Sequence, residues 1–445
     1  MYVDYFLLYI WKTYFLSIRM HRITQLKTFL FINSSAHQTI AKNTFWLLIG
    51  DIVYKFVQAT LIFWLAYTVG KEQFGLYSYI TSISWTILLL VDYNLIQTSI
   101  RSVNQWFLPP QTTMQHSIFL KILLSALSLC ILLCISLFSE QPLSFLLLLF
   151  ASYSYLLLTN IATYLRSTYR HEEMMEKETL LKILSWGILL IIWWISLFLW
   201  WNLTSFIYWL VMVWIIDLLV TCLYLPSSVF SRFFQNITFK TALSLATYWL
   251  PIAISSFLVS IYINADQIIL WRYGQHEWLG IYSFAYKISL FFTLFSSAFF
   301  NALFPKTTLY ITRENSVPIF LNWLQLIVKR NSMIILILIG ITYLLQQSNI
   351  AIFGEYTAAL WVLLILWLYC LTEPIGYWWY TILVSIKKDS LNTVFLAVTA
   401  AINILGNIIL IPIYGYIAAA RVTVFSYLLY STLCFFAITL AKNNK

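Results

Sequence analysis

Charged residues are scarce in this chain of 445 residues. Only 9% are Asp, Glu, Lys or Arg, while 61% are hydrophobic, against roughly 25% and 45–50% in soluble globular domains. A soluble protein could not hide that much apolar surface from water. The composition therefore excludes a soluble protein and indicates that most of the surface faces lipid.

Cysteine is rare as well, and its positions show no functional spacing. All five cysteines fall inside apolar runs, at Cys130, Cys134, Cys222, Cys370 and Cys434. They form neither the paired pattern of a metal site nor the framework of an extracellular disulfide-bonded protein. We expect them to be packing residues, and we expect no metal ion and no cofactor.

The first residues do not fit the pattern of a cleavable signal peptide. Residues 2–18 are apolar but contain Asp4 and Lys12, and further basic residues follow them. A signal peptide carries its positive charges first and a small-residue cleavage site afterwards. Two explanations stay open, an interfacial helix or an upstream extension with Met20 as the real start.

Apolar runs of about 20 residues are abundant, and this is the helix length that crosses about 30 Å of hydrocarbon. Twelve such runs lie at residues 43–69, 75–98, 113–138, 142–165, 179–201, 204–226, 242–270, 279–304, 325–346, 357–385, 390–411 and 416–440. They do not alternate polar with apolar residues as barrel strands do, and an open strand would leave backbone polar groups unsatisfied in lipid. The sequence predicts an all-α integral membrane protein with about twelve transmembrane helices.

The two halves of the chain share a pattern around one glycine each. Gly75 and Gly280 lie 205 positions apart, and each follows a short polar turn and starts an apolar run. Self-similarity at a fixed offset is typical of a duplicated architecture. Because six spans is an even number, both halves enter from the same side, which predicts two parallel six-helix lobes around a central cavity. We expect an N-terminal cytoplasmic or interfacial segment (1–42), a first lobe (43–226), a cytoplasmic linker (227–241), a second lobe (242–440) and a cytoplasmic tail (441–445).

Lys and Arg are distributed unevenly over the connecting segments. With the N-terminus inside, twenty of them lie in cytoplasmic segments and only Lys71 and Arg272 lie in outside loops. The positive-inside rule then places both termini in the cytoplasm. It also explains the net charge of +10 as topology, so that nucleic acid is not expected as a partner. We expect residues 166–177 to form a solvated cytoplasmic helix and loop, with lipid head-group contact as the alternative.

Nine ionisable side chains fall inside the predicted spans. They are Asp51, Lys55, Asp92, Lys121, Asp217, Asp266, Lys287, Glu373 and Arg421. At roughly 3 kcal/mol each, exposing them to lipid would cost about 25 kcal/mol, which exceeds the stability of a whole fold, about 5–15 kcal/mol. Most of them must therefore face protein or a water-filled cavity.

Spacing predicts how some of these charges are used. Asp51 and Lys55 lie four residues apart on one helical face and can pair directly, and Lys287 should lie at a depth close to Asp266. Such pairs either act in transport or only hold helices together. Glu373 precedes Pro374, where a kink could free a carbonyl for an ion or be purely structural.

Several short motifs carry a family resemblance. The opening of the polysaccharide repeat-unit flippases is resembled by the first half of this chain, in the run from Asn43 to Gly70, Gly75-Leu-Tyr77, Asp92 and Ile100-Arg101. Those flippases belong to the superfamily that also contains multidrug exporters of the MATE type and lipid II flippases. Four further motifs are similar to the start of the second half in that family, namely Trp249-Leu-Pro251, Asn264-Ala-Asp266, Gly280-Ile-Tyr-Ser283 and Phe304-Pro305. The closing pattern of the family is similar to a last set of residues, Ile352-Phe-Gly354-Glu-Tyr356, Asn403, Asn407 and Pro412-Ile-Tyr-Gly415.

The resemblance implies translocation of an undecaprenyl-diphosphate-linked oligosaccharide, for O-antigen or capsule assembly, across the bacterial inner membrane by alternating access. It implies other polysaccharide assembly proteins as partners, with a proton or sodium as coupling ion, and no enzyme activity. The nine intramembrane charges sum to −1, so that diphosphate binding rests on a few cations. The expected substrate-binding residues are Lys55, Lys121, Lys287 and Arg421, and the expected coupling or structural ion-pair residues are Asp51, Asp92, Asp266 and Glu373.

Two other classes of protein share part of this description. A MATE-like drug or metabolite exporter would have the same topology, and the balanced intramembrane charge is compatible with it. A membrane polymerase or glycosyltransferase would need catalytic groups on a sizeable external loop. The outside loops here are short and carry few acids, which disfavours that class.

Overall fold

The computed structural model describes residues 36–93, 95–96, 110–138, 140–171, 173–196, 202–225, 238–311, 317–347, 351–385 and 388–443. The segment before residue 36, to which the question of the native start belongs, lies outside the described residues, as does most of the predicted linker. All regular structure in the described ranges is helical. This agrees with the rule that a lipid-exposed segment must satisfy its backbone hydrogen bonds within itself.

The described residues of the first half of the chain form six helices. They are α3 (Ala36–Asp92), α5 (Pro110–Leu137), α6 (Leu143–Arg166), α7 (Thr168–His171), α8 (Met175–Ser196) and α9 (Leu203–Tyr224). The second half contains α11 (Phe239–Arg272), α12 (His276–Ile311), α13 (Val317–Gln347), the 3-10 helix η1 (Ala351–Tyr356), α14 (Ala359–Ser385) and α15 (Asp389–Asn443). Each predicted span coincides with a helix apart from several residues at its ends.

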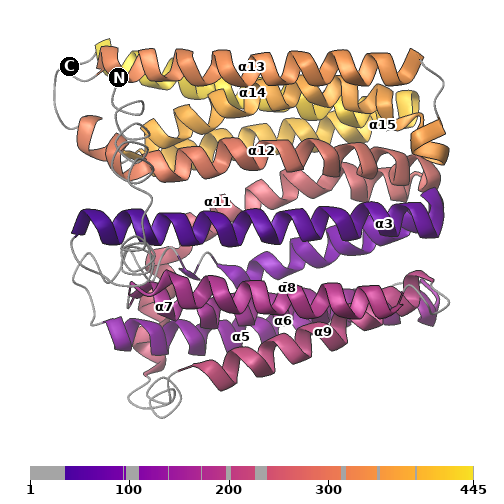
Figure 1. Ribbon diagram of the computed structural model, residues 1–445, viewed down its shortest axis with the longest axis horizontal. Coiled ribbons are helices and arrows are strands. Elements are labelled where there is room, and N and C mark those ends of the chain that lie inside the picture. The colour runs from indigo at the N-terminus through magenta and orange to yellow at the C-terminus, as the bar shows by residue number, and fades with distance from the viewer. Residues whose placement is uncertain are drawn as a thin grey trace, which may run out of the picture.

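Two of these helices are interrupted by a glycine. In α3 the backbone leaves the helical region at Gly70, with φ of 75°, and in α15 it does so at Gly415, with φ of 62°. A positive φ of this size favours glycine, which has no Cβ. Figure 1 shows α3 reaching one end of the bundle and turning back there. With 57 and 55 residues, unbroken helices would be about 80 Å long, far beyond a bilayer core, so each supplies two spans.

The interruptions account for the number of spans. Seven helices among the described residues are long and apolar enough to cross a membrane. Two of them are the interrupted stretches Phe45–Asp92 and Ser390–Ile438, of 48 and 49 residues. Dividing α3 at Gly70 and α15 at Gly415 yields six long helical segments in each half. The predicted all-α membrane architecture is confirmed.

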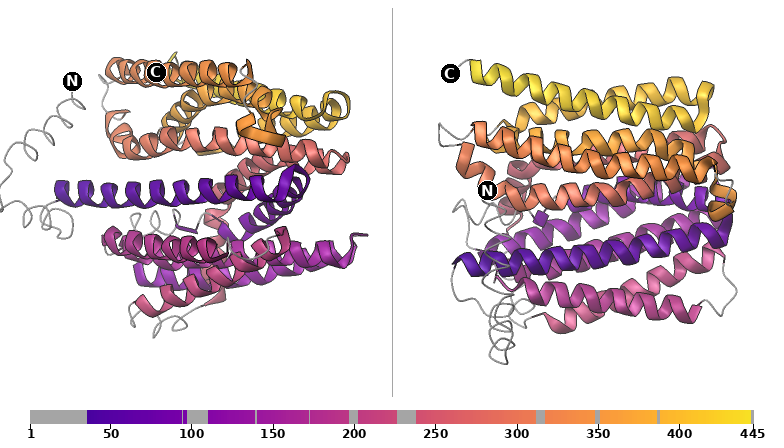
Figure 2. Two further views of the ribbon diagram at one scale, coloured as in Figure 1. Left: turned by 45° about the vertical axis from the view of Figure 1, so that its right-hand side comes forward. Right: turned by 45° about the horizontal axis from the view of Figure 1, so that its top comes forward.

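The two halves form two lobes that lie side by side. Helices α3 to α9 make up one lobe and α11 to α15 the other, as the indigo-to-magenta and pink-to-yellow groups in Figures 1 and 2 show. The lobes meet where α3 packs against α11 and α12. Because α3 is the first element of one half and α11 and α12 open the other, the repeat-related elements meet at the centre.

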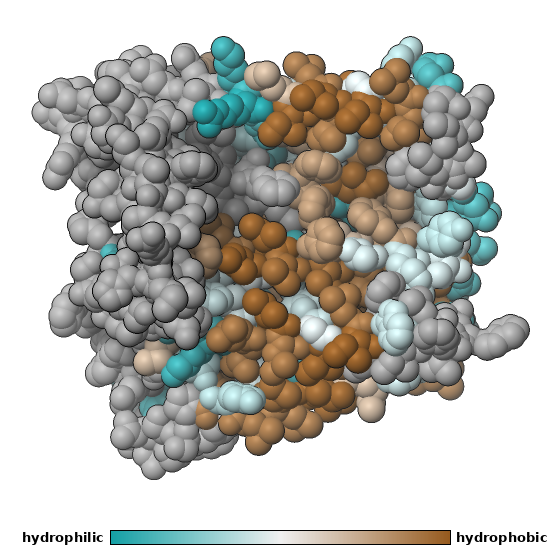
Figure 3. Space-filling view, viewed as in Figure 1, coloured by the Kyte–Doolittle hydropathy of each residue, from teal (hydrophilic) through white to brown (hydrophobic). Residues whose placement is uncertain are grey.

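The outer surface suits a lipid environment. Large apolar side chains such as Leu137, Leu223 and Leu344 are 81%, 82% and 66% exposed. On the face in Figure 3 hydrophobic residues cover the middle of the helices, and hydrophilic residues gather near their ends. This is the distribution expected when an apolar belt lies in the hydrocarbon and polar residues lie at the interfaces.

The segment at residues 166–177 differs from the prediction of a solvated loop. Arg166 is the last residue of α6 and is 2% exposed. Its guanidinium donates a hydrogen bond of 2.8 Å to the buried carboxylate of Asp217 in α9. The prediction that Arg166 belongs to a solvated cytoplasmic segment is therefore wrong, because its charge is compensated internally by Asp217.

Candidate functional site

Two of the predicted substrate-binding cations lie where the lobes meet. Lys55 belongs to α3 and Lys287 to α12, and both side chains are half-buried. The two ammonium groups are near enough for Lys55 to act electrostatically on Lys287. No described carboxylate lies within ion-pair distance of either ammonium. The structure thus brings together one cation from each half of the chain, without a paired anion.

Tyrosines surround these two lysines. The Lys55 ammonium lies 5.3 Å from the centroid of the Tyr54 ring, and the Lys287 ammonium lies 5.8 Å from the centroid of the Tyr77 ring. Aromatic faces attract cations, so the rings hold both ammonium groups in place while leaving their hydrogen-bond donors available.

One end of the lobe interface is tightly closed around the two repeat glycines. A Cβ on Gly75 would overlap the carbonyl oxygen of His276, and one on Gly280 would overlap that of Lys71. The same two Cβ positions lie 3.1 Å from Gly280 N and 3.2 Å from Gly75 N, respectively. We call this approach the glycine contact. The Lys71 ammonium also binds the Glu277 carboxylate at 2.7 Å.

Large side chains close the same end further. The Tyr356 hydroxyl donates a hydrogen bond of 3.0 Å to the carbonyl of Ala66 in the other lobe. The Tyr356 ring stacks on Phe284 at 4.5 Å and meets Phe74 edge-on at 6.2 Å. These contacts join the two lobes next to the glycine contact.

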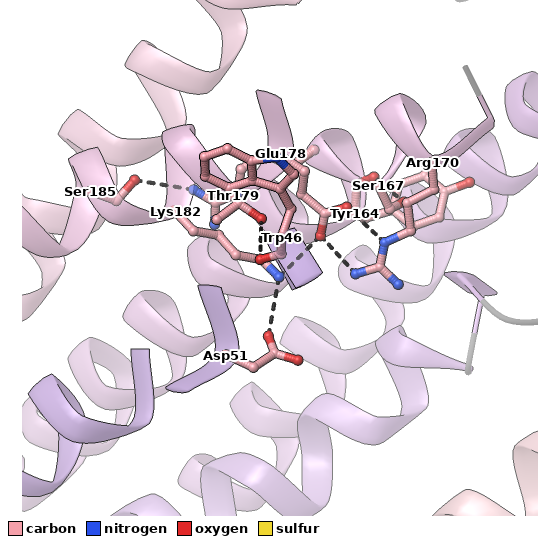
Figure 4. A network of polar contacts seen from close by, with 10 residues as sticks. Trp46, Asp51, Tyr164, Ser167, Arg170, Glu178, Thr179, Lys182 and Ser185 are labelled. Atoms are coloured by element: carbon pink, nitrogen blue, oxygen red, sulfur yellow. Dashed lines mark hydrogen bonds and ion pairs between the residues drawn. The ribbon is translucent and has the colours of Figure 1, made fainter. Parts of the chain in front are cut away.

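The predicted pair of Asp51 and Lys55 is wrong. Asp51 pairs with Lys182 of α8 at 3.4 Å, and the Lys182 ammonium also binds the buried carboxylate of Glu178 at 3.0 Å. Glu178 in turn accepts two hydrogen bonds of 2.7 Å from Arg170 (Figure 4). Spacing within one helix cannot reveal a competing cation on another helix, and Lys182 is that cation.

The predicted pair of Asp266 and Lys287 is not formed either. Asp266 is 1% exposed and accepts hydrogen bonds from the Tyr282 hydroxyl and, at 2.7 Å, from the backbone N–H of Gln267. The Tyr282 hydroxyl lies 3.5 Å from the Thr423 hydroxyl. Asp266 thus bonds within its own lobe, where Tyr282 of α12 and Thr423 of α15 lie beside it.

Glu373 and Pro374 lie inside the continuous helix α14. Proline lacks the N–H that would bond the carbonyl four residues earlier, which is that of Cys370. This carbonyl instead accepts a hydrogen bond of 3.2 Å from Asn331 of α13. Glu373 is 3% exposed. The freed carbonyl predicted as an ion ligand is therefore occupied by a side chain.

The remaining predicted residues lie away from the lysine pair. Lys121 is 4% exposed within the first lobe, between α5 and α6. Asp92 accepts a hydrogen bond of 3.0 Å from Asn160. Arg421 is exposed on α15, on the helix face that carries the exposed Phe425. A substrate-binding role for Lys121 and Arg421 stays a prediction.

Sequence reasoning missed the tyrosines and the contact between the repeat glycines. The tyrosines give no signal because the chain contains 30 of them. The glycine contact had a signal in the repeat itself. Residues related by a two-fold axis meet when they lie on that axis, so that Gly75 and Gly280, equivalent in the two halves, were candidates to face each other.

The fold is shared with transporters of known structure. A multidrug resistance MATE family transporter of the MOP superfamily in an inward-facing conformation is 13% identical, with a TM-score of 0.66 over 94% of this chain and 97% of that chain. An outward-facing conformation of such a transporter is 13% identical and scores 0.61 over 94% and 99%. The lipid II flippase MurJ in an inward closed conformation is 14% identical and scores 0.61 over 90% and 87%.

These likenesses concern the fold, because all the identities are low. A search of curated proteins finds none that matches the chain. A family model described as polysaccharide biosynthesis protein matches residues 40–308, well over half of the chain. The matched region includes the glycine contact, Lys55 and Lys287, which confirms the resemblance drawn from the sequence motifs. The chain belongs to the polysaccharide biosynthesis protein family.

Proposed function

We propose that this protein translocates an oligosaccharide linked to undecaprenyl diphosphate from the cytoplasmic to the outer leaflet of a bacterial inner membrane. The observation that carries the proposal is the pair of half-buried cations, Lys55 and Lys287, one from each lobe. Family membership supports a role in polysaccharide biosynthesis, and the fold shared with transporters supports movement of a solute across the membrane.

A diphosphate is the group that best completes the lysine pair. Two ammonium groups that act on each other across the interface repel, and the repulsion is strong where water is scarce. An anion between them removes it and accepts hydrogen bonds from both, which are of the stronger charge-assisted kind. The nearby tyrosines offer flat faces for sugar rings. Truncating one charged side chain of such a contact weakens the free energy of binding by about 2–5 kcal/mol.

The closed end of the interface fits one state of alternating access. Under the positive-inside rule the glycine contact lies at the outer side of the membrane, since Lys71 and Arg272 belong to outside loops. A protein closed there would admit its substrate from the cytoplasm.

The buried carboxylate of Asp266 supports a coupling role. An ionised carboxylate that is 1% exposed is costly unless a proton or a cation neutralises it. Tyr282 and Thr423 lie beside it and supply further oxygen atoms. We assign the coupling ion, a proton or sodium, to this position in the second lobe.

A MATE-like exporter remains the second candidate, and one observation favours it. The fold likeness to MATE transporters covers nearly the whole chain. An amphipathic cation would be repelled by Lys55 and Lys287, however, and this disfavours a cationic drug as substrate. Catalytic activity is not proposed, because no reaction follows from two lysines and tyrosines. Polysaccharide assembly proteins remain the proposed partners.

Reconstitution into liposomes tests the proposal. A fluorescent lipid-linked oligosaccharide is placed in one leaflet, and its arrival in the other is followed by quenching. We expect Lys55→Ala and Lys287→Ala to weaken substrate binding about 30-fold or more, as a loss of about 2 kcal/mol requires. Lys55→Arg, which keeps the charge, should retain more activity than Lys55→Ala.

The exposed Lys329 on α13 is the matched control, and Lys329→Ala should transport at the wild-type rate. Arg421→Ala in the same assay tests whether Arg421 belongs to the site. Dye efflux by the reconstituted protein, together with no movement of lipid-linked sugar, would establish the exporter instead. Wild-type substrate affinity of both lysine variants would contradict the assignment of the site.

A further inference from the structure

Lys121 is a buried cation that the proposed transport site does not use. Its side chain is 4% exposed, and its ammonium makes no hydrogen bond with any described residue. The contact that holds it is the Tyr164 ring, whose centroid lies 4.9 Å away. The carboxylate of Asp92 acts on it from a distance but does not form an ion pair with it in the described structure.

A small cavity adjoins this ammonium. It has a volume of about 60 Å³ and is lined mainly by Ile118, Ile122 and Ser125 of α5 and by Ile161 and Tyr164 of α6, besides Lys121 itself. Ile122 is 50% exposed, so that the cavity borders the outer face of the first lobe. Its volume exceeds what one water molecule needs. Lys121 is the single charged group among its described lining residues.

Lys121 lies near the N-terminal end of its span. It lies six residues after the start of the membrane span Gln115–Leu137, about 9 Å along the helix. Side chains on a helix lean towards its N-terminus, which the positive-inside rule places at the cytoplasmic face. A lysine stem extended in that direction brings its ammonium close to the interface.

We propose that this cavity binds a phosphate group, and that its source is an anionic membrane lipid of the cytoplasmic leaflet. The phosphate oxygens would accept the hydrogen bonds that the Lys121 ammonium lacks, and the Ser125 hydroxyl lies on the same wall. The isoleucines would contact the apolar part of the lipid beside its head group. The site lies within the first lobe and is independent of the transport proposal.

Lipid binding to the purified full-length protein in detergent tests this inference. Phosphatidylglycerol, a diacylglycerol with the same acyl chains, and sodium phosphate are added separately. Bound lipid is counted by native mass spectrometry, and the melting temperature is measured alongside. We expect phosphatidylglycerol to bind and raise the melting temperature, and diacylglycerol to do neither. An effect of sodium phosphate equal to that of phosphatidylglycerol would assign the site to the free ion, and so overturn the lipid source.

Three variants assign the effect to a site. Lys121→Met keeps the volume of the side chain and removes its charge, and it should lose the phosphatidylglycerol effect. Without lipid it should be at least as stable as wild type, because an uncompensated buried charge is unfavourable. Lys329→Met should keep the lipid effect. If Lys121→Met keeps it and Lys287→Met loses it, the phosphate binds between the lobes and the inference is overturned.

Discussion

At the scale of the residue, several buried carboxylates in this protein are compensated by cations from other helices. Glu178 is an example, because its carboxylate is fully buried and binds Arg170 of α7 as well as Lys182, one turn further along its own helix α8. Burial raises its pKa, but the hydrogen bond and charge of Arg170 and the charge of Lys182 outweigh burial and bring the pKa below the ordinary value of 4.5. Glu178 precedes the predicted fifth span, near the end of the bundle.

The first prediction concerns Glu178→Gln. It leaves Arg170 without its carboxylate and should destabilise the protein by about 3–5 kcal/mol at pH 7. Since the folded-state pKa is lowered, the stabilisation is present above pH 4.5 and is lost as the pH falls through the lower folded-state value. Thermal unfolding in detergent should therefore show the gap between wild type and variant narrowing below pH 4.5. The exposed Glu72 provides a control, and Glu72→Gln should change stability little at any pH. A gap that is independent of pH would contradict the ionised state of Glu178.

At the scale of the element, the helices keep their continuity where the sequence would interrupt them. Pro374 lies within α14, and the carbonyl of Cys370 that it leaves without a partner is satisfied by Asn331 from α13. Gly70 and Gly415 do interrupt their helices, because the chain must turn back there. A proline in a membrane helix is thus tolerated when a neighbouring helix provides the missing donor.

The second prediction is a double-mutant test of whether Asn331 supplies the hydrogen-bond donor that Pro374 lacks. Asn331→Ala should destabilise the protein by about 1–3 kcal/mol, since the buried Cys370 carbonyl loses its donor. In a Pro374→Ala background the backbone N–H of residue 374 can bond that carbonyl, and the cost of Asn331→Ala should fall by at least half. Unfolding in detergent measures both costs. Met333→Ala, at a 59% exposed position of the same helix, is the control. Equal costs of Asn331→Ala in the two backgrounds would show that the bond to Cys370 is unimportant.

For the whole molecule, backbone packing rather than charge holds the lobes together at the glycine end. The ion pair of Lys71 and Glu277 is 33% and 54% exposed, and exposed pairs contribute about 0–1 kcal/mol. The glycine contact excludes even a methyl group on either residue. A larger side chain there must push the lobes apart, which is how substrate would leave if the proposed transport cycle is right.

The third prediction compares the glycine contact with the ion pair of Lys71 and Glu277. Gly75→Val should open the glycine end, whereas Lys71→Ala should leave it nearly unchanged. A cysteine introduced at the buried Ala66, in a background without native cysteines, reports the opening through its reaction with a membrane-impermeant thiol reagent. We expect the reaction to be at least ten times faster with Gly75→Val. Gly187→Ala, at a position where a Cβ would meet nothing within 4 Å, should leave the rate unchanged. An equal increase with Lys71→Ala would mean that charge holds the lobes together.

The sequence alone determined the class, the helices and the duplicated plan of this protein. The apolar composition requires a lipid environment, and an apolar run of about 20 residues in lipid requires a helix. The offset between Gly75 and Gly280 shows that the chain has two similar halves. These properties depend on neighbours along the chain. The repeat motifs also led to the family, because their order and spacing survive when overall identity is low.

Tertiary structure alone decided the partners of the charges. Asp51 bonds to Lys182 rather than to Lys55, and Asp266 bonds to Tyr282 rather than to Lys287. An ionic or hydrogen-bonded contact needs atoms within about 3–4 Å, and helical spacing fixes such distances only within one helix. Across helices they depend on packing and rotation, which a periodic pattern does not specify. For the same reason only the packed lobes bring Lys55 and Lys287 together and place Gly75 against Gly280.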